Sequence, residues 1–181
     1  MEAGTVWAAA WQFVSGRLVR LLIRWCGFIP SQQTPLAKDE RDPVSPREYV
    51  LRRVFAAADH FNPALSEPVQ RVAFQPNKKD AAGISVFREL FVTPMEVARR
   101  GPKGPSEYIV VRLLAADVFA LGLSVLPDPQ ADQPPGHAII PELTPQTEKK
   151  RSKELQRELA KLGGRNIAYR ATLSGVQGQP G

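Results

Sequence analysis

The sequence predicts an α+β domain, with a small mixed or antiparallel sheet, two to three packed helices, an N-terminal amphipathic helix and a C-terminal charged helix. Short runs rich in valine, isoleucine and leucine recur between residues 69 and 141, and turns rich in glycine and proline separate them. The segments before and after this region carry apolar residues at helical spacing. Hydrophobic residues are 43% and charged residues 23% of the 181 positions, as in a folded domain.

Residues 6–28 have the pattern of one amphipathic helix within a predicted segment 1–29. Its arginines occupy a stripe to one side, and they make it a poor membrane span. An apolar face this long needs a cover, which is the domain itself, a protein partner or second copy, or a membrane surface. The apolar face is made of Trp7, Trp11, Val14, Leu18, Leu21, Leu22 and Trp25.

Residues 30–44 have the composition of a flexible linker, with several prolines and mixed charges. The core domain is expected over residues 45–145. Formal charge supports this division, because residues 30–147 carry 13 basic and 14 acidic residues, a net charge of −1. The basic character of the whole chain therefore belongs to its two ends.

The core is expected to begin with a helix. Ser45 is a suitable N-cap, Pro46 suits the first helical position, and Glu48 completes a capping box. Apolar residues then recur at helical spacing from Tyr49 to Phe61. Asn62-Pro63 ends the predicted helix.

The middle of the chain reads as short strands with one helix between the second and third. Thr93 caps this helix, Pro94 opens it and Glu96 sits three residues after the cap. Residues 115–120 read as a helical turn. The predicted strands are Val69–Phe74, Gly83–Phe87, Tyr108–Leu114, Leu121–Leu126 and His137–Ile140.

Residues 146–181 are predicted to form a basic helix and a flexible tail. The helix is expected over 147–162, with Thr147 as its cap and Gly163-Gly164 as its end. Residues 148–170 hold eight basic and three acidic residues, a net charge of +5. No aromatic residue interleaves with the basic ones of this helix, so the sequence favours a solvated charged face over base stacking.

Composition excludes several classes of site. A single cysteine excludes an intrachain disulfide framework, and two histidines exclude a three-histidine metal centre. Neither a phosphate-binding loop nor a dinucleotide fingerprint occurs. The sequence therefore predicts no metal and no cofactor.

His137 is the candidate catalytic residue, because it opens an apolar strand directly after a proline-rich loop. Arg71, Arg88 and Arg112 are candidate ligand-binding residues, since each lies in or at the end of a strand-like run. If the strands are neighbours, these guanidinium groups and His137 would form an anion site. The alternative, which base rates favour, is that His137 packs against a backbone carbonyl and each arginine pairs with a nearby acid.

Three blocks of the sequence, Asp80-Ala-Ala-Gly-Ile-Ser-Val-Phe-Arg88, residues 110–125 and Gly136-His-Ala-Ile-Ile-Pro141, resemble small uncharacterised bacterial proteins. The resemblance covers about 80–141 and neither end of the chain. It implies a domain of bacterial type and transfers no activity and no functional residue.

The expected function is that of a non-enzymatic interaction domain in the bacterial cytoplasm, with peripheral membrane attachment as an alternative location. A protein partner, or a second copy, would contact the terminal helices, chiefly residues 6–28. The alternative function is a small enzyme or ligand-binding domain for an anionic substrate such as a nucleotide, using His137 and the arginines. Binding of nucleic acid or a membrane surface through the basic ends is the weakest of these hypotheses.

Overall fold

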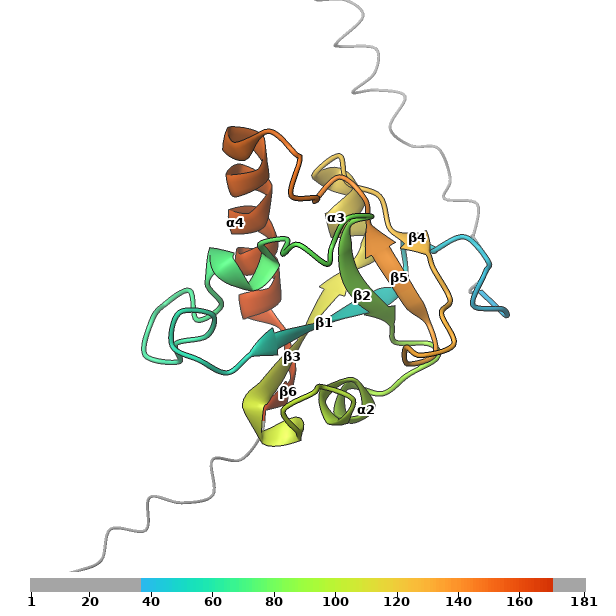
Figure 1. The fold of residues 1–181 in the computed structure, drawn as a ribbon, viewed down its shortest axis with the longest axis horizontal. Helices are drawn as coiled ribbons and strands as arrows, with labels where there is room; N and C mark the ends of the chain where they lie inside the picture. Colours follow the sequence, from blue (N-terminus) through green and yellow to red (C-terminus); the bar gives the residue numbers. More distant parts are fainter. Residues whose placement is uncertain (1–36, 171–181) are drawn as a thin grey trace, which may run out of the picture. The chain divides into compact units, whose positions relative to one another are not determined.

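The computed structural model describes residues 37–170, in which six strands form one antiparallel sheet of order β4-β5-β2-β1-β3-β6 (Figure 1). The strands are β1 (Tyr49–Phe55), β2 (Ile84–Arg88), β3 (Tyr108–Leu114), β4 (Leu126–Pro127), β5 (His137–Ile140) and β6 (Ile167–Arg170). The helices are α2 (Pro94–Arg99), α3 (Ala115–Ala120) and α4 (Lys149–Arg165), with two short 3₁₀ turns, η1 (Arg71–Phe74) and η2 (Pro105–Glu107). The predicted α+β class is confirmed, and the sheet is antiparallel throughout. The helix predicted over residues 6–28 lies outside the described residues.

The centre of the chain folds largely as its local patterns indicate. The predicted strands over 83–87, 108–114 and 137–140 correspond to β2, β3 and β5. Helix α2 has the predicted capping box, because the Thr93 hydroxyl accepts from the Glu96 backbone N–H and the Glu96 carboxylate accepts from the Thr93 N–H.

The helix predicted over residues 46–61 is wrong: residues 49–55 form strand β1, at the centre of the sheet. One of the two contacts of the predicted capping box nevertheless exists, since the Ser45 N–H donates to Glu48 Oε1 at 2.9 Å. It closes a turn that leads into the strand. Because β1 carries buried side chains on both faces, its apolar residues do not alternate cleanly with polar ones. A short run of this kind fits the spacing of a helix as well as that of a strand.

Each face of the sheet packs against a different helix. One face, with Val50 and Val54 of β1, packs against Leu159 and Ala160 of α4 and against η1 and α3. The other face, with Leu51, packs against α2. The sheet therefore has covered surfaces on both sides, and a side chain on β1 enters one layer or the other according to its position.

Strands β1 and β2 separate soon after they meet. β1 pairs with β3 along its whole length, from Tyr49 to Phe55. It pairs with β2 only at Val50 and Leu51, and the two strands point in clearly different directions in Figure 1. Residues 52–55 of β1 consequently have a partner strand on one side only.

Two other predicted strands are also wrong in whole or in part. Residues 71–74 form the 3₁₀ turn η1, which places the fully buried Phe74 in the core beneath α4. Of residues 121–126, only Leu126 belongs to a strand, the two-residue β4. Gly122 has φ +73°, which turns the chain after α3 and prevents an extended run there.

Helix α4 begins and ends later than the sequence indicates. Its N-cap is Glu148, while the Thr147 hydroxyl donates to the Glu142 carbonyl oxygen at 2.8 Å and does not cap the helix. Gly163 lies inside the helix, where the absence of a side chain allows close packing, since a Cβ there would lie 3.0 Å from a Val111 side-chain carbon. Within residues 37–170, no helix combines the length and the apolar character needed to cross a membrane.

Candidate functional site

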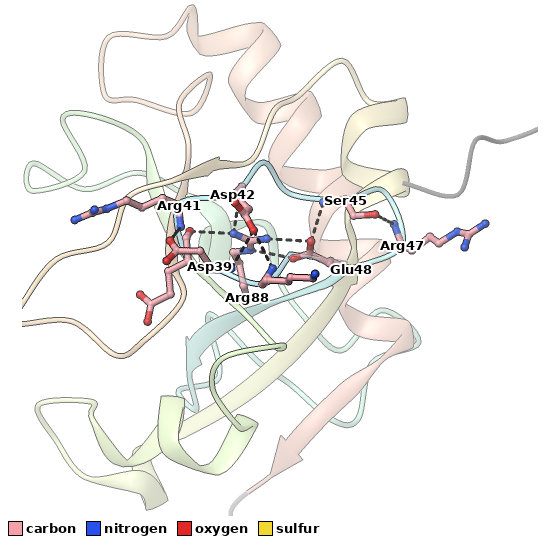
Figure 2. A network of polar contacts seen from close by, with 9 residues as sticks. Asp39, Arg41, Asp42, Ser45, Arg47, Glu48 and Arg88 are labelled. Carbon is pink, nitrogen blue, oxygen red and sulfur yellow. Dashed lines mark hydrogen bonds and ion pairs between the residues drawn. The ribbon is translucent and has the colours of Figure 1, made fainter. Parts of the chain in front are cut away.

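Arg88, one of the three arginines of the predicted anion site, is buried and lies at the centre of the polar network in Figure 2. Its Nε and Nη2 donate to the two carboxylate oxygens of Glu48 at 2.9 and 3.0 Å. Its Nη1 donates to the carbonyl oxygens of Glu40 and Asp42 at 2.9 and 2.8 Å. The guanidinium is thus occupied by contacts within the fold.

The same network anchors the described part of the predicted linker, residues 37–44. Hydrogen bonds from the backbone N–H groups of Asp39 and Lys38 hold the pKa of the Asp42 carboxyl below its ordinary value. Val44 is buried in the core. The second half of the predicted linker therefore makes specific contacts with β2 through Arg88.

Arg112 and His137 also make contacts within the fold. Arg112 on β3 forms an ion pair with Glu89, and its guanidinium carbon lies 5.3 Å from the centre of the Tyr49 ring. His137 is buried, with Nδ1 2.7 Å from the Asp128 carbonyl oxygen. These are the contacts expected of an arginine paired with an acid and of a histidine that packs at a strand end.

The four predicted site residues do not converge on one pocket. Arg88 pairs in register with Val50, and Arg112 with the adjacent Leu51, so the two guanidinium groups leave opposite faces of the sheet. Arg112 and His137 share a face but are three strands apart, with a Cα separation of about 14 Å. Arg71 lies on the α4 side, where its Nη1 donates to Gln156 Oε1 at 2.8 Å.

The free edge of β1 borders a cleft of about 400 Å³, which we call the β1 cleft. Its polar and aromatic lining residues are Arg52, Arg53, Phe55, His60, Gln75 and Tyr108. No aspartate or glutamate is among its lining residues in the described part of the chain. Its volume falls within the range of small-molecule sites, about 300–1,000 Å³.

Backbone donors also face the β1 cleft. The Tyr49 carbonyl oxygen accepts from the Glu89 N–H at 3.0 Å, which shows that the odd-numbered residues of β1 turn their backbone groups toward β2. Because these groups alternate along a strand, Arg53 and Phe55 direct theirs to the same side. There the register with β2 has already ended at Leu51. The edge thus presents N–H groups next to two guanidinium groups.

Arg52 is held in place at the junction of the two diverging strands. Its Nη1 donates to the Ser85 carbonyl oxygen of β2 at 2.7 Å, and its Nε lies 3.4 Å from the Ala73 carbonyl oxygen. Burial lowers the pKa of the Arg52 guanidinium, while Asp80 acts in the opposite direction and Arg53 adds to the lowering. An anion in the cleft would offset the cost of keeping this partly buried cation charged.

Arg53 leaves the opposite face of the strand. Its guanidinium carbon lies 5.3 Å from the Tyr108 ring centre, and its Nη1 donates to the Val97 carbonyl oxygen at 3.1 Å. Burial lowers its pKa too, and Tyr108 partly opposes this. Two adjacent arginines on one strand therefore bring positive charge to both sides of the same free edge.

Aromatic side chains complete the β1 cleft. The rings of Phe55 and His60 meet edge to face at 6.1 Å, and those of Phe55 and Tyr108 at 5.8 Å. His60 Nδ1 lies 2.8 Å from Asp59 Oδ1, and this hydrogen bond lowers the pKa of the Asp59 carboxyl. A further cation, Lys103, lies 4.3 Å from the Phe55 ring centre.

A second groove, of about 360 Å³, lies against the first turns of α4, and we call it the α4 groove. Arg71, Lys149 and Lys153 bring three cations to its lining, and no acidic residue of the described chain lines it. The α4 groove and the β1 cleft share Gln75 and Pro76, so the two depressions flank the same short segment. Of the predicted ligand-binding residues, Arg71 alone lines either depression.

Sequence reasoning missed Arg52 and Arg53 because it assigned them to a helix, on which adjacent residues diverge by about 100° and do not share an edge. Two consecutive arginines within an apolar run were the available signal. His60 lies within the helix predicted over residues 46–61. In the structure it follows strand β1 and lines the cleft.

Among residues 37–170, no group of three or more His, Cys, Asp or Glu side chains is placed to hold a metal ion. Comparisons of the chain with protein families, with curated proteins and with solved structures give no significant match. The case for function therefore depends on the geometry of the two depressions.

Proposed function

We propose that the protein binds a phosphate-bearing ligand, such as a nucleotide, in the β1 cleft. The observation that carries this proposal is that Arg52 and Arg53 are neighbours on a strand edge that has no partner strand. They line a cleft without an acidic lining residue in the described chain. Guanidinium groups match phosphate oxygens in shape and charge, and the edge N–H groups of β1 add neutral donors.

The aromatic residues favour a ligand that carries a base. Phe55 and His60 are both partly exposed, so their rings offer an apolar surface beside the cations. A nucleotide unites a flat π-system with a charged phosphate, and both parts find a chemical match here. Inorganic phosphate alone would use only the cationic part of the cleft.

The test compares thymidine monophosphate (TMP) and inorganic phosphate by isothermal titration calorimetry at constant ionic strength. Arg52→Lys keeps the charge but loses the planar fork, so we expect TMP affinity to fall about tenfold to a hundredfold, the value of a charged hydrogen bond. His60 is partly exposed, and we expect His60→Gln to weaken the binding of TMP more than the binding of phosphate.

Arg99→Gln is the matched control, because Arg99 is exposed on α2 and lines neither depression. It should leave TMP affinity within about twofold of the wild type, since an exposed distant charge is screened by salt. The proposal fails if the wild type shows no binding of TMP, or if Arg99→Gln weakens binding as much as Arg52→Lys does.

The protein-partner hypothesis for residues 6–28 stays a prediction, because that segment lies outside the described residues. For the C-terminal helix, α4 buries its apolar residues Leu159 and Ala160 in the core. A partner of α4 would therefore meet a charged face, and this favours an anionic ligand over an apolar protein surface.

A further inference from the structure

We propose that the β1 cleft and the α4 groove form one track for a single strand of nucleic acid. The inference rests on the proposed function, since it places one nucleotide in the β1 cleft and lets the chain continue into the α4 groove. The two depressions meet at Gln75 and Pro76, which line both of them. A ligand that leaves one across this segment enters the other.

Positive charge lies in both halves of the track. Arg52 and Arg53 supply it in the first half, and Arg71, Lys149 and Lys153 supply it in the second. Over the described residues, neither half has an acidic lining residue that would repel a phosphate. A mononucleotide needs only one such cluster, whereas a polymer with a phosphate on every unit uses both.

The floor of the α4 groove is fixed by a chain of hydrogen bonds. Arg71 Nη1 donates to Gln156 Oε1 at 2.8 Å, and Gln156 Nε2 donates to Ser152 Oγ at 2.7 Å. Gln156 and Ser152 are both buried. Lys149 and Lys153 are exposed and lie one helical turn apart above this floor, where they can follow a flexible backbone.

The fold supplies the aromatic surface that the basic helix lacks. Within α4 no aromatic side chain accompanies the basic ones, and a helix of that kind gives only electrostatic attachment. The β1 cleft brings Phe55, His60 and Tyr108 to the other half of the track. Stacking of one base there, with phosphates held on either side, requires an unpaired strand, because the bases of a duplex are already stacked.

The test measures fluorescence anisotropy of a 5′-labelled thymidine tetranucleotide, (dT)4, with the full chain, and competition by TMP. We expect (dT)4 to bind about 30-fold or more tightly than TMP, well above the gain from having four equivalent units. A hairpin duplex should bind less tightly than a single-stranded thymidine oligonucleotide with the same number of phosphates.

The decisive variant is Lys149→Gln/Lys153→Gln, and its matched control is Lys150→Gln/Arg157→Gln, which removes the same charge from exposed positions outside the groove. The groove variant should weaken the binding of (dT)4 about tenfold. It should also reduce the slope of log K against log salt by about 1.4, the value for two phosphate contacts on a single strand. It should leave TMP affinity within about twofold, because TMP occupies the β1 cleft. The control should change neither ligand's affinity by more than about twofold.

The outcomes separate the two proposals. If TMP binds and responds to Arg52→Lys, but (dT)4 binds no more tightly than TMP, or the groove variant and its control behave alike, the track is wrong and the proposed function stands. If the hairpin duplex binds as tightly as the single-stranded thymidine oligonucleotide with the same number of phosphates, the track is also wrong, because base stacking then plays no part. If TMP and (dT)4 are both insensitive to Arg52→Lys, both proposals are wrong.

Discussion

Replacing Arg88 by methionine is expected to lower the free energy of unfolding by about 3–5 kcal/mol, because the Glu48 carboxylate is then buried without its cation. Both side chains have 0% exposure, so water cannot replace the lost partner. The carbonyl oxygens of Glu40 and Asp42 lose their donor as well. Urea unfolding followed by circular dichroism measures the change.

The double variant Glu48→Gln/Arg88→Met is the control for this effect. Glutamine removes the buried charge and keeps an oxygen that accepts from the Ser45 N–H. It should be more stable than Arg88→Met alone by about 1–2 kcal/mol. A single variant that loses less than about 1 kcal/mol, or a double variant that is the less stable of the two, would contradict the assignment of a buried ion pair.

Replacing Phe74 by alanine is expected to cost about 3–5 kcal/mol, because its ring is fully buried between the sheet and α4. The cavity left behind would lie beneath η1, the turn that leads directly to Gln75 and Pro76. Loss of this anchor should therefore loosen the segment that borders both depressions. Denaturant unfolding measures the first effect, and hydrogen exchange of the Gln75 and Asn77 amides measures the second.

Leu65→Ala is the comparison for Phe74→Ala, since Leu65 is a large apolar residue with 49% exposure. Its replacement should change the stability by no more than about 0.5 kcal/mol. If the two variants lose similar amounts, Phe74 does not support the core as the structure indicates. If Phe74→Ala lowers stability without faster exchange at the Gln75 and Asn77 amides, the turn has another anchor.

Local patterns predicted those elements whose ends are marked by their own residues. Helix α2 follows from Thr93, Pro94 and Glu96, which cap it within a few positions. Strands β2 and β5 follow from apolar runs that begin after a glycine; Gly83 and Gly136 have φ +132° and +73°. In each case the determining contacts lie close in the sequence.

The prediction for the first segment of the core failed because the contacts that decide its structure are distant in the sequence. Ser45 and Glu48 make one of the two contacts of a capping box, yet Glu48 also binds Arg88, 40 positions away. This ion pair and the register with β3 select a strand over a helix for residues 49–55. Neither interaction can be read from the local pattern, and the apolar spacing fits both structures.

The choice of candidate site residues depended on the same helix assignment. With residues 46–61 assigned to a helix, Arg52 and Arg53 had no reason to share a site, while Arg71, Arg88 and Arg112 lay in predicted strands. The register of the strands shows that Arg88 and Arg112 occupy opposite faces of the sheet. The alternation of side chains along each strand cannot reveal this unless it is known which residues pair across the strands. The gap that opens where β1 and β2 separate has no signature in the sequence.

The most direct test of the account is an amide ¹H–¹⁵N correlation spectrum of the ¹⁵N-labelled protein, recorded as TMP is added at constant ionic strength. The β1 cleft predicts the largest changes at residues 52–55 and 72–77 and at the Nε–H of Arg52, because these groups border the bound phosphate. Changes centred on His137 and Arg112, or no changes beyond those that sodium chloride produces, would contradict a site at the free edge of β1.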